Sequence, residues 1–86
     1  MASLEEKLSQ ALTRRLRDGQ VDLERLPNGR VVGHVVSSEF DGLSYDDRRK
    51  RLWQIIDEEL TAEEARQVST LLTYTPEEWN IPLQDT

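Results

Sequence analysis

The sequence predicts an α+β fold in which helices pack on one face of a three-stranded sheet. Three observations lead to this prediction. Leucines recur at helical spacing near the start of the chain, two β-rich segments flank a Pro-Asn-Gly turn, and a second apolar helical pattern precedes a further β-rich segment. The expected order is α-β-β-α-(α)-β-α, with the hairpin and the later strand forming the sheet.

The first helix is expected from Ser3 to about Arg17. Its apolar side chains share one helical face, at Leu4, Leu8, Ala11, Leu12 and Leu16. Ser3 and Glu6 have the spacing of a capping box, in which each side chain accepts a hydrogen bond from the backbone amide of the other residue. Gly19 suits the left-handed position that often follows a helix.

A β-hairpin is expected next, because residues 20–26 alternate apolar and polar side chains and residues 30–37 are rich in valine. The Pro-Asn-Gly sequence at residues 27–29 is typical of a turn. Gly33 lies in the middle of the second strand, where a glycine often marks a bulge or the close approach of another backbone.

The second helix is expected from Tyr45 to Leu60, with Ser44 as its N-cap. Its apolar side consists of Tyr45, Leu52, Trp53, Ile55, Ile56 and Leu60. Arg48 falls near the edge of that side and Arg49 falls within it, so the Arg49 side chain must extend past the helix end or meet a partner. This helix should be the main packing element of the fold.

The last part of the chain predicts a short helical turn, a strand and a final helix. Thr61 and Glu64 have capping-box spacing, and residues 68–74 read as the third strand. The sequence TPEEW at residues 75–79 then offers a capping threonine, a proline for the first helical position and a glutamate that completes the capping box. Its tryptophan is available to pin the helix down, and residues 80–86 are expected to form a loose tail.

Length and composition limit the classes of function. A chain of 86 residues is one domain, placed here at residues 1–79. It contains no cysteine, which excludes disulfides and thiolate metal sites, and its net charge of −6 does not favour nucleic acid. No apolar stretch approaches the roughly 20 residues of a membrane span and no signal peptide is recognisable, so a cytoplasmic protein without membrane contact is expected.

Two segments resemble the BolA-like family. HVVSSEFDGLSYDDR, residues 34–48, resembles the family's strand, its Val-Ser-x-x-Phe-x-Gly-x-Ser motif and its helix with an early arginine, and VSTLLTYTPEEW, residues 68–79, resembles its last strand and its ending. The element order agrees too, so the resemblance covers most of residues 3–79. It implies a compact fold similar to a type II KH domain. It also implies association with monothiol glutaredoxins around a bridging iron–sulfur cluster, and roles in iron homeostasis, stress or transcription.

The same resemblance implies cluster ligands that this sequence lacks. The family's histidine before the last strand corresponds to Gln67, its histidine at the start of the second strand corresponds to Arg30, and its third candidate position falls in the Pro-Asn-Gly turn. Glutamine is a weak neutral donor that does not suit soft iron–sulfur chemistry. We therefore expect no cofactor and little or no direct cluster ligation. His34, the only histidine, is a weak metal candidate whose simpler interpretation is an ordinary strand side chain.

The expected function is the binding of a protein partner such as a monothiol glutaredoxin, without catalysis. The candidate partner-binding residues are His34, Arg48, Arg49, Tyr74 and Trp79. No nucleophile elbow, phosphate loop or metal-binding spacing is present, and the acidic residues at 57–59 and 63–64 are typical of a solvated helix face. These observations predict a protein that is not an enzyme.

The alternative function is a nucleic-acid-binding transcriptional regulator. Its candidate site is the one basic cluster of the sequence, Arg48, Arg49, Lys50 and Arg51. Consecutive helical residues point about 100° apart, so these four side chains do not form one patch, and the Gly-x-x-Gly loop of KH domains is missing. The simpler interpretation is a solvated first turn, with Lys50 and Arg51 facing solvent and pairing with Asp46 and Asp47.

Overall fold

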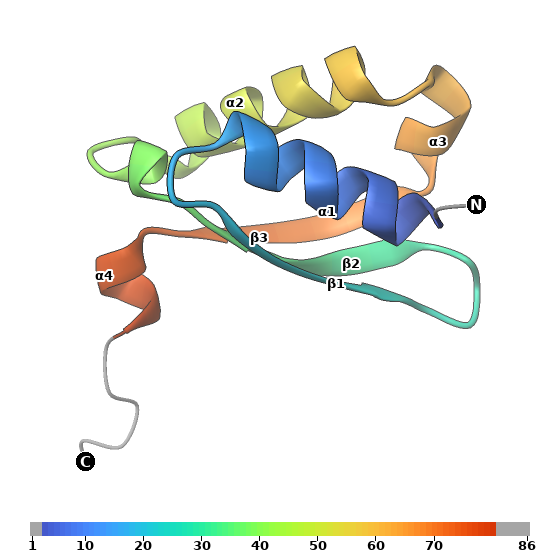
Figure 1. The fold of residues 1–86 in the computed structure, drawn as a ribbon, viewed down its shortest axis with the longest axis horizontal. Coiled ribbons are helices and arrows are strands. Elements are labelled where there is room, and N and C mark those ends of the chain that lie inside the picture. Colours follow the sequence, from blue (N-terminus) through green and yellow to red (C-terminus); the bar gives the residue numbers. More distant parts are fainter. Residues whose placement is uncertain (1–2, 81–86) are drawn as a thin grey trace.

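The structure is a computed structural model that describes residues 3–80. Figure 1 labels its elements, which are α1 (Leu4–Arg15), β1 (Gln20–Arg25), β2 (Val31–Val36), the 3₁₀ helix η1 (Ser38–Phe40), α2 (Tyr45–Glu59), α3 (Ala62–Arg66), β3 (Val68–Tyr74) and α4 (Pro76–Trp79). The predicted class and element order are confirmed. Of the predicted tail, only Asn80 belongs to the described residues. Within residues 3–80, no helix has the length and apolarity needed to cross a membrane.

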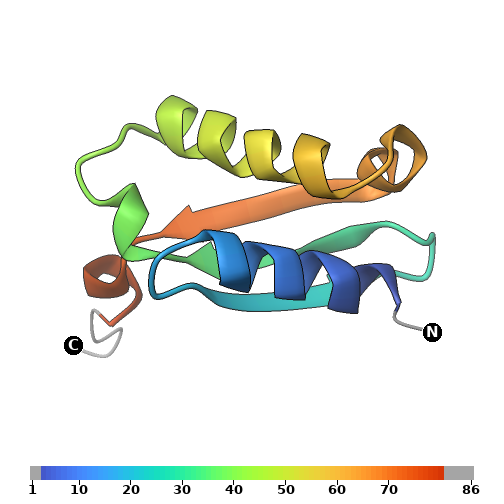
Figure 2. The ribbon, with the colours of Figure 1, turned by 45° about the horizontal axis from the view of Figure 1, so that its top comes forward.

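The three strands form a mixed sheet in the order β1-β2-β3. The central strand β2 pairs with β1 in an antiparallel manner, as a hairpin, and with β3 in a parallel manner. Parallel neighbours need a long crossover, which α2 and α3 provide. Figures 1 and 2 show α1 and α2 lying over the same face of the sheet, as predicted, whereas α4 lies at the end of β3 and on the other side.

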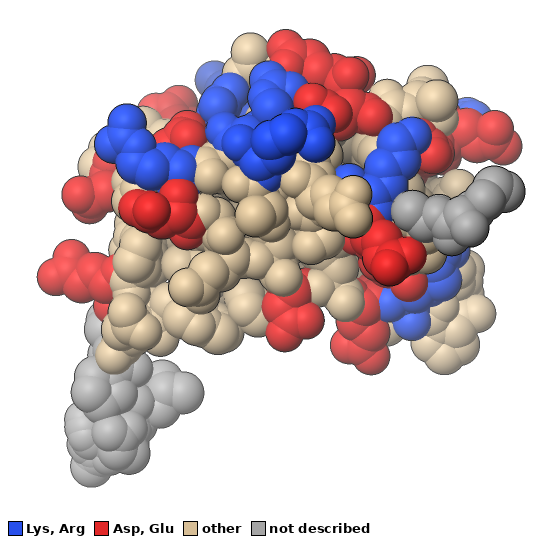
Figure 3. All heavy atoms as spheres, in the orientation of Figure 1, with Lys and Arg blue, Asp and Glu red and all other residues tan. Residues whose placement is uncertain are grey.

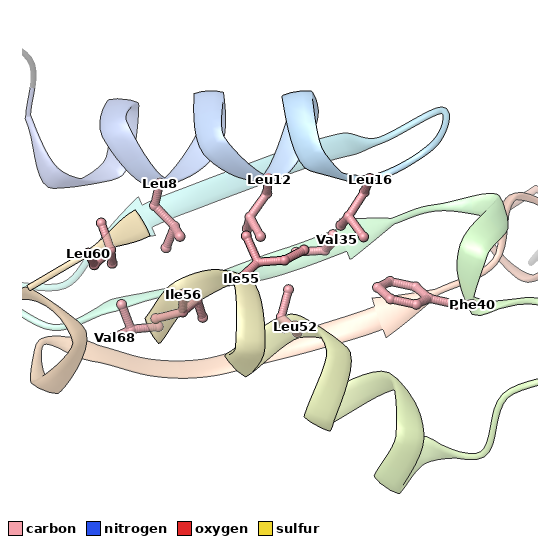
Figure 4. Close-up of a cluster of buried hydrophobic side chains, with 10 residues drawn as sticks. All are labelled: Leu8, Leu12, Leu16, Val35, Phe40, Leu52, Ile55, Ile56, Leu60 and Val68. Carbon is pink, nitrogen blue, oxygen red and sulfur yellow. The ribbon is translucent and has the colours of Figure 1, made fainter. Parts of the chain in front are cut away.

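The core lies between the sheet and the two long helices, as Figure 4 shows. Its buried residues are Leu8, Leu12, Leu16, Val35, Phe40, Leu52, Ile55, Ile56, Leu60 and Val68. Phe40 closes one end of this cluster, and Leu60 and Val68 close the other. Burying each such side chain stabilises the fold by about 1.5–3 kcal/mol relative to leaving it exposed.

The helix starts predicted from the sequence are present. Capping boxes form at the starts of α1, α3 and α4, and the Ser44 hydroxyl accepts a hydrogen bond from the Asp47 amide at the start of α2. These caps involve side chains only three residues apart, so the local sequence is sufficient to specify them.

The end of α1 differs from the prediction. The helix ends at Arg15, two residues early, and the left-handed conformation belongs to Asp18 (φ 53°), not to Gly19. Aspartate tolerates this conformation because its short side chain can form local hydrogen bonds. The early end lets the chain turn while Leu16 remains in the core, where it is only 3% exposed.

The two arginines at the start of α2 exchange the positions that the helical wheel gives them. Arg48 is buried, at 7% exposure, whereas Arg49 is exposed and Tyr45 is 75% exposed. The sheet ends at β3, so the side of α2 that carries Arg49 and Trp53 borders a groove beside this edge strand. A helical wheel assumes that one whole side is covered, and here no fourth strand covers it.

Candidate protein-binding surface

Three aromatic side chains meet on the face of the sheet that α1 and α2 leave uncovered. They are His34 of β2, Tyr74 of β3 and Trp79 of α4, and we call them the aromatic cluster. Side chains alternate along a strand. Since Val35 and its neighbour Thr73 are buried beneath the helices, His34 and Tyr74 point to the opposite face.

The rings of the aromatic cluster are in direct contact. Trp79 stacks on His34 with ring centroids 4.2 Å apart and an angle of 25° between the planes. Tyr74 meets His34 edge-on at 6.2 Å, and it lies 5.3 Å from Trp79 in a tilted arrangement. Aromatic pairs of this kind contribute about 0.5–1.5 kcal/mol each beyond their buried area. The Trp79 ring therefore fastens α4 to the sheet, as the sequence predicted in general terms.

An ion pair fastens the other side of α4. The Arg48 guanidinium donates two hydrogen bonds to the Glu78 carboxylate, at 2.9 and 3.0 Å. It also donates to the carbonyl oxygens of Leu43, at 3.1 Å, and Thr73, at 3.5 Å. Arg48 thus joins the start of α2, the end of β3 and the last helix, and its buried donors are satisfied.

Glu78 serves two partners at once. Its carboxylate accepts the hydrogen bonds of Arg48 and that of the Thr75 backbone amide, which completes the capping box of α4. The Arg48 hydrogen bonds are the main reason that the pKa of Glu78 falls to about 2, and the Thr75 amide adds to this effect. Sequence reasoning assigned Glu78 only a capping role. The second role depends on an arginine 30 positions away, and no local pattern indicates it.

The surface around the aromatic cluster is apolar at its centre and acidic along one side. Leu72, which pairs with His34 across the sheet, is 52% exposed, and Trp79 is 45% exposed. On the opposite side His34 pairs with Asp22 of β1, and Glu24 follows on the same face. Large exposed apolar side chains grouped on one face are typical of interaction sites.

The structure brings together some of the predicted site residues and separates others. His34, Tyr74 and Trp79 form one cluster, and Arg48 lies next to it through Glu78 but is buried and already bonded. Arg49 lies apart, in the groove between α2 and β3. The five predicted residues therefore divide into the aromatic cluster, the buried Arg48 that supports it, and Arg49, which lies on a different surface.

The four consecutive basic residues do not act as a unit. Arg51 is half-buried and pairs with Glu39 at 3.3 Å, not with Asp47 as predicted, because η1 lies beside α2. Only Arg49 and Lys50 are exposed. On the face drawn in Figure 3, basic groups lie mostly over the helices and border acidic groups, and no extended basic surface appears there.

The residues present do not fit an iron–sulfur cluster of the kind that the BolA-like resemblance implies. The chain has no cysteine, and within residues 3–80 no group of three histidine or acidic side chains could hold a metal ion. Gln67 ends α3, where its backbone carbonyl oxygen accepts a hydrogen bond from Val31. These residues supply no set of ligands for iron.

Comparisons with known proteins identify the fold but no sequence relatives. The sequence matches no family model, and no curated protein is similar to it in sequence. The structure is similar to that of BolA1 from Arabidopsis thaliana, with a TM-score of 0.74 and 16% identity, over 95% of this chain and 100% of that one. The BolA-like resemblance read from the sequence is therefore confirmed at the level of the fold.

Proposed function

We propose that this chain is a non-enzymatic interaction protein of BolA-like fold that binds another protein through the aromatic cluster and the neighbouring Leu72. The observation that carries the proposal is the apolar surface on the open face of the sheet, where Leu72 and Trp79 remain half-exposed beside His34 and Tyr74. A soluble monomer gains nothing from exposing these side chains, whereas a partner would bury them.

The partner that the BolA-like resemblance supports is a monothiol glutaredoxin, and the cellular context is iron or redox homeostasis or a stress response. Because this chain offers no ligand set, its role in such a pair is to bind and position the partner, which supplies the ligands of any cluster. The acidic side of the surface, formed by Asp22 and Glu24, favours a partner with basic residues at the matching edge.

A substitution on the exposed part of the surface tests the proposal. Leu72→Glu places a charge at the centre of the contact without disturbing the core, because Leu72 is half-exposed. We expect it to weaken the binding of a monothiol glutaredoxin at least about tenfold in calorimetry. Thr13→Glu, at an exposed position on α1, is the control and should bind as the unsubstituted chain does. Equal affinities for the two variants would contradict the proposal.

The absence of direct cluster ligation has its own test. A mixture of this chain with a cluster-loaded monothiol glutaredoxin should have a visible absorption spectrum that His34→Ala does not change. If that substitution abolished the spectrum of a stable mixed complex, this chain would be supplying a ligand, and the proposed role would be wrong.

The alternative, a nucleic-acid-binding regulator, has less support. Of its four candidate residues, Arg48 is bonded to Glu78 and Arg51 to Glu39, which leaves Arg49 and Lys50. Two exposed cations on a chain of net charge −6 make few phosphate contacts. Binding to a short oligonucleotide that weakens steeply with salt would favour this alternative.

A further inference from the structure

A groove lies on the side of the molecule where the sheet ends. It has a volume of about 320 Å³ and runs between the first half of α2 and the free edge of β3. The residues of α2 that line it are Tyr45, Asp46, Arg49, Leu52 and Trp53, and residues 69–74 line its strand side. The aromatic cluster lies on the open face of the sheet, whereas this groove opens beside the edge of β3. The two surfaces share Leu72 and Tyr74, but Arg49, Leu52 and Trp53 belong to the groove alone.

The strand side of the groove is an unpaired sheet edge, because β3 pairs only with β2. The Tyr74 carbonyl oxygen accepts a hydrogen bond from Ser37, so it points towards β2. Backbone groups alternate along a strand, and the N–H and C=O of Leu71 therefore point outward to the free edge. A peptide backbone lying in the groove could bond to both.

The two ends of this edge are protected, and the middle is not. At one end Thr73 is buried and its carbonyl oxygen accepts a hydrogen bond from Arg48. At the other end the register shifts between Val31 and Gly33, which disturbs the edge near Ser69 and Thr70. The open stretch is centred on Leu71, and no charged residue interrupts the chain between Arg66 and Glu77.

The rim of the groove is positive although the chain is acidic. Within residues 3–80, Arg49 and Lys50 form no ion pair, and both lie beside Trp53. Asp46 is the only acidic side chain that lines this region. A ligand with negative charge near an apolar segment complements this rim.

We propose that the groove binds an extended acidic peptide, which adds a short fourth strand at Leu71 and places apolar side chains against Trp53 and Tyr45. Its backbone pairs with the N–H and C=O of Leu71, and its acidic side chains face Arg49 and Lys50. The free strand edge favours a peptide over a nucleic acid, since nucleic acid has no backbone that pairs with a sheet. The proposal does not rest on the glutaredoxin partnership.

The test uses a synthetic peptide of alternating valine and glutamate, titrated into the isotope-labelled full chain. We expect amide shifts at residues 69–72 and at Arg49, and a shift of the Trp53 indole, with a dissociation constant in the range of about 10 to 1,000 μM. A peptide of the same sequence with methylated backbone nitrogens should not bind, because it cannot pair as a strand. A peptide of alternating valine and lysine should bind more weakly.

Two variants separate the groove from general charge effects. Arg49→Glu should weaken the binding of the acidic peptide at least about fivefold. Arg30→Glu makes the same charge change at an exposed position beyond the groove, and it should leave this binding unchanged. Three results would overturn the proposal. They are an equal loss of peptide affinity in both variants, binding of the methylated peptide as strong as that of the unmethylated one, and an absence of any amide shifts. Tighter binding of an oligothymidine at the same residues would assign the groove to nucleic acid instead. Glutaredoxin binding is read separately, from the Trp79 indole.

Discussion

At Gly33 the two strands of the hairpin approach so closely that no side chain fits. A Cβ atom there would overlap the Asp22 carbonyl oxygen and would lie 2.9 Å from the Leu23 Cα. Both neighbours are backbone atoms of the paired strand, so they cannot move aside as a flexible side chain would. The glycine in the middle of β2 is therefore a requirement of the hairpin, as the sequence indicated.

We expect Gly33→Ala to lower the free energy of unfolding by about 3 kcal/mol, the cost of forcing an atom into a closely packed site. Gly29→Ala is the matched control. Gly29 has a positive φ of 88°, but no other atom lies within 4 Å of the position that a Cβ atom would take. Its substitution should therefore cost only about 1–2 kcal/mol of backbone strain. Urea unfolding measures both values. A smaller loss at Gly33 than at Gly29 would contradict the close approach.

Glu78 couples stability to pH. Its pKa is about 2 in the folded chain, against 4.5 for a free glutamate, because Arg48 holds it as a carboxylate. A depressed pKa stabilises the folded state above the unfolded pKa. This contribution is lost as the pH falls from about 4.5 towards about 2, since the unfolded chain takes up the proton first.

The substitution Glu78→Gln tests this coupling through the pH dependence of the free energy of unfolding. The variant should be less stable than the unsubstituted chain at about pH 7, and the difference should shrink as the pH falls towards 3. Other glutamates with lowered pKa, such as Glu59 and Glu64, are the same in both chains and cancel in the comparison. A difference in stability that stays constant over this range would show that the Arg48 contact does not set the pKa.

At the scale of elements, α4 is the least embedded part of the fold. It has four residues and contributes none to the core, and it is held by its capping box, by Arg48 and by the Trp79 ring. An isolated helix of this length is not stable in water. Its position over His34 therefore depends on these three attachments.

We expect Trp79→Ala to release α4 without unfolding the sheet. The backbone amide of residue 79 donates a hydrogen bond to the Thr75 carbonyl oxygen at 2.9 Å. In the variant, hydrogen exchange should accelerate at this amide while the amides of β2 stay protected. The global stability should fall by only about 1–2 kcal/mol. Phe40→Ala, which removes a fully buried core ring, should instead cost about 3–5 kcal/mol and speed exchange throughout the sheet. Similar exchange patterns in both variants would contradict a separately attached α4.

These elements show what the sequence can and cannot predict. The helix starts follow from neighbouring residues, so the caps at Ser3, Thr61 and Thr75 were correct. The positions of Arg48 and Arg49 were not, because they depend on where the sheet ends and on where α4 docks. Both are tertiary properties that a helical wheel does not contain.

At the scale of the molecule, the order of elements was enough to predict a three-stranded sheet with helices over one face, but not that β3 pairs with β2 in a parallel manner. The candidate site was predicted in part. The sequence named His34, Tyr74 and Trp79 separately, and their contact follows from a parallel β2–β3 register that no short pattern reveals. Leu72, which is more exposed than any of the three rings, was missed because an alternating strand does not show which face stays uncovered.

The most direct test of the central claim is an amide-resolved NMR titration of the labelled chain with a monothiol glutaredoxin, first without and then with its cluster. The proposed function predicts shifts at His34, Leu72, Tyr74 and the Trp79 indole, the same with both forms of the partner. The opposite result is an absence of shifts on this face at high partner concentration, or shifts around His34 that appear only with the cluster. Either would contradict a surface that binds the partner without ligating its iron.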